Sequence, residues 1–253
     1  MSKFVLGNWK MNKNSIEAKE FISQLLKLLK KTGDVEIAIA APFTLLPLLK
    51  KEFLHTKIKV AAQNLFYEDV GAYTGEISAG MLRDYAEYVI IGHSERRKYF
   101  NESDEIINRK IKAAQKAGLK AVLCIGETLA QKKTGKTNAA LEKQLNIGLF
   151  GIDKLEKITI AYEPVWAISG GNTSHKPATS VDAQKAHLFI RKLLSKLCGN
   201  KAAKSIKIIY GGSSNPDNAK SLLSMPDIDG CLPGVASLDP VKFAKLIEIA
   251  KAL

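Results

Sequence analysis

ITIAYEP, residues 158–164, is an apolar run that ends in a carboxylate joined directly to a proline. The run has no helical spacing, and near-continuous apolarity over this length is typical of a strand that is covered on both faces, as in a parallel sheet. Pro164 disfavours the helical region for the residue before it, so Glu163 is held in an extended conformation. The segment therefore predicts a buried strand that presents an acid at its carboxyl end.

Seven further runs of this kind alternate along the chain with segments of helical spacing, and no linker or low-complexity segment separates them. A barrel of eight parallel strands with outer helices needs about 250 residues, which agrees with this chain. We therefore predict α/β architecture, a (β/α)8 barrel forming a single catalytic domain over 1–253. The other predicted strands are 4–10, 35–42, 58–64, 88–95, 121–127, 206–213 and 229–237, and the clearest predicted helices are 15–31, 104–118, 182–197 and 239–250.

An open doubly wound sheet is the main alternative fold. It predicts a glycine-rich fingerprint directly after the first strand, whereas the chain reads GNWKMN at 7–12. Local signals support the helices: Ser103 and Asp239 stand where two of them begin, and Gly33, Gly118 and Gly199 stand where others end.

Composition limits the class of protein. The chain has 253 residues, 46% of them hydrophobic, and no stretch approaches the ~20 apolar residues of a membrane span. The N-terminus has no long apolar core before a small-residue cleavage site, so we expect no secretory signal. Three cysteines at irregular spacing, Cys124, Cys198 and Cys231, do not form a disulfide framework. A reducing, cytoplasmic setting is predicted, without membrane association.

The formal net charge of +13 raises the question of an anionic partner. Only five of the 38 basic residues are arginine, and the lysines are spread along the chain at positions that helices turn to solvent. A nucleic-acid-binding protein more often clusters arginine with aromatic residues. The pattern favours a solvated lysine surface and no nucleic-acid partner, and an anionic small substrate fits the charge equally well.

Polar side chains gather where the predicted strands end. All carboxyl ends of parallel strands meet at one rim of a barrel, which is where sites are built. Residues two apart on a strand share a face, so we expect Asn8 with Lys10, and His93 with Glu95, to point into one pocket. The rim also carries Gln63, Asn64, Glu127, Glu163 and the turn 211–213.

Two of these positions suggest an anion and a carbonyl as ligands. His93 precedes SERR, which opens a helical turn, and the helix dipole disfavours an imidazolium there. Ser213 follows two glycines and precedes a helix start, so successive backbone N–H groups form a cradle for an anion; Gly234 is expected to supply a second one.

Seven motifs in this order resemble the triosephosphate isomerase family, and together they span nearly the whole chain. They are GNWKMN (7–12), AQN (62–64), GAYTGEIS (71–78), IIGHSERR (90–97), CIGET (124–128), AYEPVWAI (161–168) and IYGGS (209–213). The resemblance implies a cofactor-free and metal-free aldose–ketose isomerase of glycolysis and gluconeogenesis. It implies Glu163 as the base, His93 as the electrophile, Lys10 and Asn8 as substrate contacts, and Glu95 as the residue that holds Lys10.

The same resemblance implies the remaining site residues. Ser169, Ser213, Gly234 and Val235 are expected to bind the substrate phosphate, while Ile168 and Leu232 press apolar surface against Glu163. Residues 65–80 form a loop longer than the 2–6 residues that usually follow a barrel strand, and it displays aromatic side chains. In the family this loop enters a neighbouring subunit, which implies a homodimer in which Thr74 approaches the partner's site.

Two segments depart from the family pattern. The lid region 169–177 contains about four extra residues, which leaves its register after Gly171 open. Val235 stands where the family usually has a second glycine, and Pro233 removes an N–H donor. Three alternatives stay open: a Schiff-base aldolase that uses Lys10, a basic nucleic-acid-binding protein, and a barrel that serves only as a structural partner.

Overall fold

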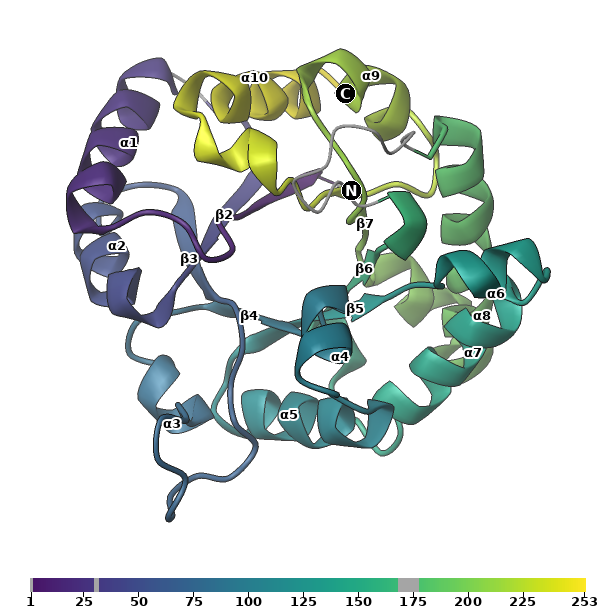
Figure 1. The fold of residues 1–253 in the computed structure, drawn as a ribbon. Coiled ribbons are helices and arrows are strands. Elements are labelled where there is room, and N and C mark those ends of the chain that lie inside the picture. Colours follow the sequence, from purple (N-terminus) through teal and green to yellow (C-terminus); the bar gives the residue numbers. More distant parts are fainter. Residues whose placement is uncertain (1, 30–31, 168–177) are drawn as a thin grey trace.

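The computed structural model describes residues 2–29, 32–167 and 178–253. Eight parallel strands close into a barrel in which each strand pairs with the next and β8 pairs with β1, and the helices form a ring outside it (Figure 1). The predicted (β/α)8 architecture is confirmed. The strands are β1 (Phe4–Asn8), β2 (Glu36–Ala41), β3 (Ile58–Ala62), β4 (Tyr88–Ile91), β5 (Lys120–Ile125), β6 (Ile158–Tyr162), β7 (Ile208–Tyr210) and β8 (Gly230–Cys231).

The strands are apolar on both faces because each face packs against a different layer. One buried cluster fills the barrel interior and includes Leu6, Ile90 and Val122. The larger cluster lies between the strands and the outer helices and includes Ile39 and Leu123. A strand buried on both sides has no polar face, which explains why the runs in the sequence do not alternate.

Helix starts agree with the local sequence signals. Asn14 forms a capping box with Glu17, Ser103 accepts from the N–H of Ile106, and Asp239 caps the last helix. Among the described residues, no helix is long and apolar enough to cross a bilayer. The helices are α1 (Ser15–Leu28), α2 (Leu46–Glu52), α3 (Ala79–Leu82), α4 (Ser94–Tyr99), α5 (Asp104–Lys116), α6 (Leu129–Lys133), α7 (Thr137–Gly148), α8 (Ser180–Ser205), α9 (Pro216–Leu223) and α10 (Pro240–Lys251), with short 3-10 turns η1 (Phe43–Leu45), η2 (Leu155–Lys157), η3 (Val165–Ala167) and η4 (Val235–Leu238).

Several predicted boundaries were wrong. The strands end one to six residues earlier than the apolar runs, and β8 contains only two residues before the chain turns into η4. Gly199, which was expected to end a helix, has φ 79° and a non-helical backbone, so α8 consists of two helices that meet at a kink there, in agreement with the expectation. Gly118 does follow the end of α5 and has φ 84°, a conformation that glycine adopts without strain.

His187, on α8, gives the fold a defined response to acid. Its side chain is fully buried, and its Nδ1 lies 3.0 Å from the carbonyl oxygen of Asp227. Burial lowers the pKa of His187 from 6.5 to about 3. The folded state therefore stays neutral at this residue while the unfolded state takes up a proton as the pH falls below about 6.5. Stability contributed by the neutral ring is present above that pH and is lost on acidification.

We expect His187→Gln to reduce this pH dependence. Between pH 6.5 and pH 3 the wild type should lose about 1.4 kcal/mol of unfolding free energy per pH unit through His187. Urea unfolding at pH 7.5 and pH 5.5, compared between the two proteins, measures the difference. An identical change in stability for both proteins would show that His187 is not the group that titrates.

Candidate active site

Glu163 follows β6 directly and lies in a gap between two neighbouring strand ends. Its backbone N–H donates to the carbonyl of Ile125 at 2.7 Å, and the residue is 1% exposed. A Cβ at Gly126 would overlap the Glu163 carbonyl oxygen, and one at Gly211 would lie 2.7 Å from its Cγ. Glycine is therefore required on both sides of this glutamate, because only glycine leaves room for it.

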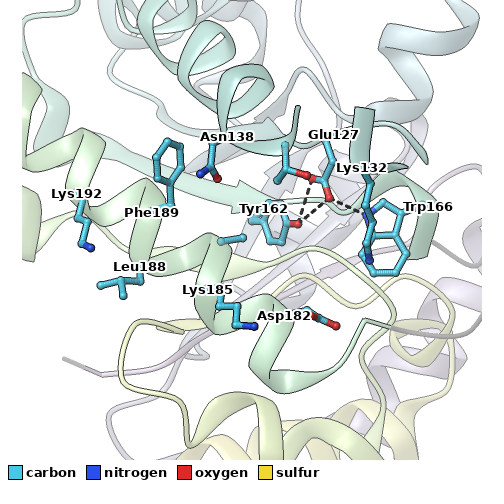
Figure 2. Close-up of a pocket in the computed structure, with 12 residues that line it drawn as sticks. Glu127, Lys132, Asn138, Tyr162, Trp166, Asp182, Lys185, Leu188, Phe189 and Lys192 are labelled. Carbon is cyan, nitrogen blue, oxygen red and sulfur yellow. Dashed lines mark hydrogen bonds between the residues drawn. The ribbon is translucent and has the colours of Figure 1, made fainter. Parts of the chain in front are cut away.

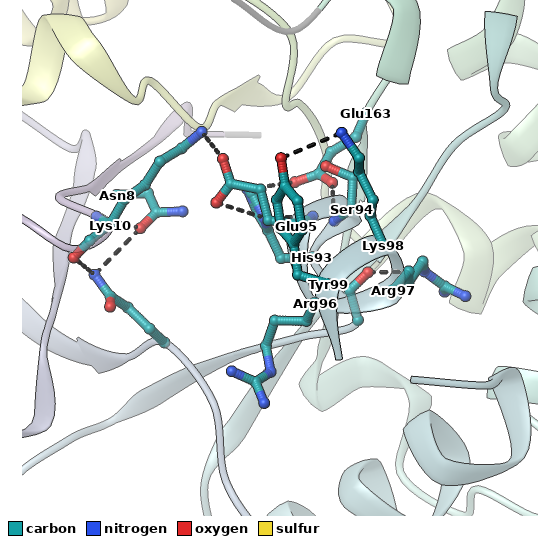
Figure 3. Close-up of polar contacts among 12 residues, drawn as sticks. Asn8, Lys10, His93, Ser94, Glu95, Arg96, Arg97, Lys98, Tyr99 and Glu163 are labelled. Atoms are coloured by element: carbon teal, nitrogen blue, oxygen red, sulfur yellow. Dashed lines mark hydrogen bonds and ion pairs between the residues drawn. The ribbon is translucent and has the colours of Figure 1, made fainter. Parts of the chain in front are cut away.

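Two groups of α4 surround the Glu163 carboxylate. The backbone N–H of Ser94 donates to Oε2 at 2.8 Å, and His93 Nε2 lies 3.2 Å from Oε1 (Figure 3). His93 is the N-cap of α4, and its Nδ1 accepts from the backbone N–H of Glu95 at 3.3 Å. A ring nitrogen that accepts carries no proton, so the neutral ring holds its proton on Nε2. His93 thus presents a donor towards the same space as Glu163.

Lys10 lies on the opposite side of the site. Its Nζ is 2.6 Å from Glu95 Oε1, and its backbone N–H donates to Asn8 Oδ1 at 3.0 Å (Figure 3). The two side chains of this ion pair are 28% and 37% exposed, and such a pair contributes little stability. Its effect is to fix the position of the ammonium group.

The predicted convergence of these side chains is observed, but the alternation argument behind it was wrong. β1 ends at Asn8 and β4 at Ile91, so Lys10 and Glu95 are not strand residues. Lys10 has φ 52° and Gly92 has φ 75°, and these turns, not the strand pleat, direct the side chains inward. A left-handed conformation at a lysine costs about 1–3 kcal/mol, so neighbouring contacts must hold it.

Gln63 supplies those contacts, and no role was predicted for it. Its Nε2 lies 2.9 Å from the carbonyl oxygen of Lys10, 3.1 Å from that of Ala40 and 3.3 Å from Asn8 Oδ1. Gln63 follows β3 at the carboxyl rim, so its position in the sequence was the available signal. The amide joins the ends of three strands around the strained turn at Lys10.

We expect Gln63→Met to lower kcat about tenfold or more and to cost about 1–3 kcal/mol of stability, because buried acceptors lose their donor. Methionine has a similar length but no N–H groups. Steady-state kinetics and thermal unfolding check the two effects. A folded variant with the wild-type kcat would show that Lys10 keeps its conformation without the hydrogen bonds from Gln63.

The segment after β8 brings the expected phosphate cradle next to Lys10. A Cβ at Gly234 would lie 3.4 Å from Cε and 3.9 Å from Nζ of Lys10. Val235 is 65% exposed, and its φ is not positive. The backbone at Val235 therefore does not need the left-handed conformation that favours glycine. The second cradle precedes α9, where Asn215 is the N-cap and the Ser213 carbonyl accepts from Asn218 Nδ2 at 3.0 Å.

Of the two residues expected to press apolar surface against Glu163, the structure describes only one. Leu232 is 3% exposed and belongs to the cluster that fills the barrel interior. Ile168 and Ser169, with the rest of the lid region to Pro177, lie outside the described residues.

Cys124 was not singled out for the site. Burial raises the pKa of its thiol well above the usual range, and the nearby Glu163 carboxylate adds to this shift.

Glu127, another predicted rim carboxylate, lies away from this group. It is 1% exposed and accepts from Trp166 Nε1 at 2.7 Å and from the Tyr162 hydroxyl at 3.1 and 3.2 Å (Figure 2). The Lys132 ammonium lies 2.9 Å from the centroid of the Trp166 ring. Glu127 therefore anchors η3, the last described segment before the lid region.

A cavity of about 310 Å³ opens at this rim, and its lining includes Lys10, His93, Glu95 and Gln63. Within the described ranges, no group of three or more His, Cys, Asp or Glu side chains is placed to hold a metal ion. The lining brings an imidazole and an ammonium to one cavity, and the Glu163 carboxylate lies 3.2 Å from that imidazole.

Comparison with known proteins agrees with this arrangement. A family profile described as triosephosphate isomerase matches residues 3–250. This chain belongs to the triosephosphate isomerase family. The triosephosphate isomerase of Geobacter metallireducens is 50% identical over 247 residues, which is 96% of this chain and 97% of that protein. That of Thermodesulfovibrio yellowstonii is 47% identical over 247 residues, 97% of this chain and 98% of that protein.

A solved structure supports the same conclusion for the fold. The crystal structure of triosephosphate isomerase from Bartonella henselae has a TM-score of 0.89 and 38% sequence identity, and the match covers 98% of this chain and 99% of that one. Membership of the triosephosphate isomerase family confirms the predicted enzyme class, an aldose–ketose isomerase. The aldolase and nucleic-acid-binding alternatives are not favoured.

Proposed function

We propose that this chain interconverts dihydroxyacetone phosphate and D-glyceraldehyde 3-phosphate, with Glu163 as the single base. The Glu163 carboxylate removes a proton from the carbon next to the substrate carbonyl, and the electron pair moves onto the carbonyl oxygen. The resulting enediolate takes a proton back from Glu163 at the neighbouring carbon. Proton transfer between the two oxygens completes the exchange of aldehyde and ketone.

The negative charge that forms on oxygen needs donors already in place. His93 Nε2–H and the Lys10 ammonium are the two donors we assign, since both residues line the same cavity and His93 Nε2 lies 3.2 Å from Glu163. Glu95 holds Lys10 through the 2.6 Å ion pair, and Asn8 binds substrate while its Oδ1 fixes the Lys10 backbone. No redox or metal step is required, because the reaction moves protons only.

Phosphate binding is assigned to both cradles. Gly234 and Val235 lie on the Lys10 side, and Ser213 lies before α9, so backbone N–H groups and an ammonium would share the charge. Ser169 and Ile168 complete the assignment from the lid region, and Leu232 supplies apolar surface from β8. Enclosure of the site by these residues would exclude water and strengthen the electrostatic contacts.

The observation that carries the proposal is the position of the Glu163 carboxylate, 3.2 Å from His93 Nε2 and almost fully buried at the mouth of the barrel. A coupled assay with D-glyceraldehyde 3-phosphate and the purified chain tests it. We expect efficient conversion without added metal and in the presence of a chelator. Absence of conversion by the folded protein would overturn the assignment.

We propose further that the chain forms a homodimer through residues 65–80. Thr74 lies at the exposed tip of this loop, and Val70 (84% exposed) and Tyr73 (45% exposed) display apolar surface beside it. Met11 (96% exposed) and Phe100 (64% exposed) line the cavity next to Lys10 and Glu95. Isolated proteins seldom expose such groups together, and a second copy of the loop would cover them.

The cytoplasm is the setting we propose for this activity. The three cysteines of the chain, Cys124, Cys198 and Cys231, are free thiols, which suits a reducing compartment. The net charge of +13 would attract a phosphorylated substrate and raise its rate of encounter with the site.

A further inference from the structure

The loop 65–80 is tied to the barrel through a stack of four planar groups. The Arg109 guanidinium of α5 lies 3.6 Å from the centroid of the Tyr67 ring. Tyr67 stacks on Phe66 with centroids 4.3 Å apart and planes 27° apart, and Phe66 contacts Tyr73 in a tilted arrangement, with centroids 4.6 Å and planes 46° apart. Tyr73 directly precedes Thr74, so the stack runs from α5 to the tip of the loop.

Other contacts keep the stack in place at both ends. Arg109 also pairs with Glu68 at 2.7 Å, and the Phe66 N–H donates to the Ile77 carbonyl at 2.8 Å, which closes the base of the loop. A Cβ at Gly71 would lie 2.6 Å from the Tyr73 ring, so glycine there lets the ring approach the backbone. In Figure 1 the segment between β3 and α3 extends outward beyond the ring of helices.

We propose that Arg109 positions the dimer loop in advance, so that Thr74 reaches the partner's active site without first losing conformational freedom. The inference rests on the proposed homodimer and adds to it a residue that touches neither active site. A loop already ordered in the free subunit costs less to order on association, which lowers the dissociation constant. Arg109 acts through Tyr67, Phe66 and Tyr73 and is a positioning residue for the other subunit's site.

The chemistry of the stack distinguishes arginine from lysine. A planar guanidinium stacks flat on an aromatic face and pairs with a carboxylate at the same time, whereas an ammonium is a point charge with no flat face to stack. Arg109→Lys keeps the charge opposite Glu68 and removes the planar contact. Arg109→Ala removes both. Lys112→Ala is a matched control, because Lys112 lies on the same helix three residues away and is exposed.

The test measures dimer dissociation and activity on the full-length chain. We expect Arg109→Ala to raise the dimer dissociation constant at least about tenfold, about 1.4 kcal/mol, since each dimer loses two such stacks. Arg109→Lys should follow Arg109→Ala, and Lys112→Ala should match the wild type. Sedimentation velocity and the loss of specific activity on dilution give the constants, and circular dichroism confirms that each variant is folded.

Recovery at high protein concentration separates positioning from general damage. Concentrated Arg109→Ala should regain the wild-type kcat and KM, because mass action restores the dimer. The inference is overturned if Arg109→Ala dissociates no more readily than Lys112→Ala, or if Arg109→Lys behaves as the wild type. A wild-type chain that is monomeric and fully active would instead refute the proposed dimer itself.

Discussion

Glu163→Gln should lower kcat by about a thousandfold or more while the protein stays folded, because general-base catalysis contributes on the order of 10²–10⁴ in rate. Glutamine has the shape of glutamate and still offers an oxygen to the Ser94 N–H, which donates at 2.8 Å in the wild type. It cannot accept a proton from carbon. Steady-state kinetics in both directions measure the loss of kcat, and a melting curve shows whether the protein stays folded.

Glu163→Asp is the matched control for that change. Aspartate keeps the negative charge but withdraws it by one methylene group, so activity should fall less than in Glu163→Gln, since misplacement of a catalytic group by about 1 Å costs about a hundredfold. Near-normal turnover in Glu163→Gln would remove Glu163 as the base.

Lys10→Met should have the second largest effect. The ammonium that stabilises the enediolate and attracts the phosphate is lost, so we expect kcat to fall about 10²–10³-fold and KM to rise. Glu95 also loses its partner at 2.6 Å and adds an uncompensated negative charge beside an anionic substrate. Initial rates over a wide range of substrate concentration separate the two parameters.

Lys13→Met is the control for charge alone. Lys13 is three residues away on the same segment, but its Nζ lies 3.0 Å from the Leu238 carbonyl oxygen and 4.8 Å from the centroid of the Phe21 ring, outside the site. Both variants lower the net charge equally. Similar kinetic losses in both would mean that long-range attraction, and not a contact of Lys10, carries the effect.

The barrel was predictable from the sequence because each strand contacts two apolar layers. A strand such as β6 contains no polar alternation, and a chain of this length accommodates eight such units. Element ends were less predictable. An apolar run does not reveal where pairing stops, and the turns at Lys10 and Gly92 depend on contacts from distant segments.

The principal residues of the candidate site could be predicted from the sequence, but the residues that hold them in place could not. Glu163, His93 and Lys10 stand at strand ends in recognisable motifs. Gln63 joins three strand ends that are up to 55 residues apart from it in sequence, and such bonds exist only once the barrel has closed. The Arg109 contact with Tyr67 is of the same kind, because α5 and the loop meet only in the folded chain.

Burial of Glu127 shows why rim position alone is an incomplete guide. Both it and Glu163 follow buried strands and are 1% exposed. Glu127 is enclosed by donors from Tyr162 and Trp166, which occupy its oxygens, whereas the group nearest to Oε1 of Glu163 is His93 Nε2 at 3.2 Å. Glu163 thus lies against a residue that lines the cavity, whereas Glu127 is held by aromatic donors away from it.

Isomerisation in D₂O tests the central claim most directly. Dihydroxyacetone phosphate is converted by the wild type, the product is trapped by a coupling enzyme, and proton NMR reads deuterium at carbon 2. Transfer through the Glu163 carboxylate allows exchange with solvent, so we predict a deuterated product and the loss of this conversion in Glu163→Gln. Turnover that yields product wholly free of deuterium and that persists in Glu163→Gln would indicate direct hydride transfer and would contradict the account.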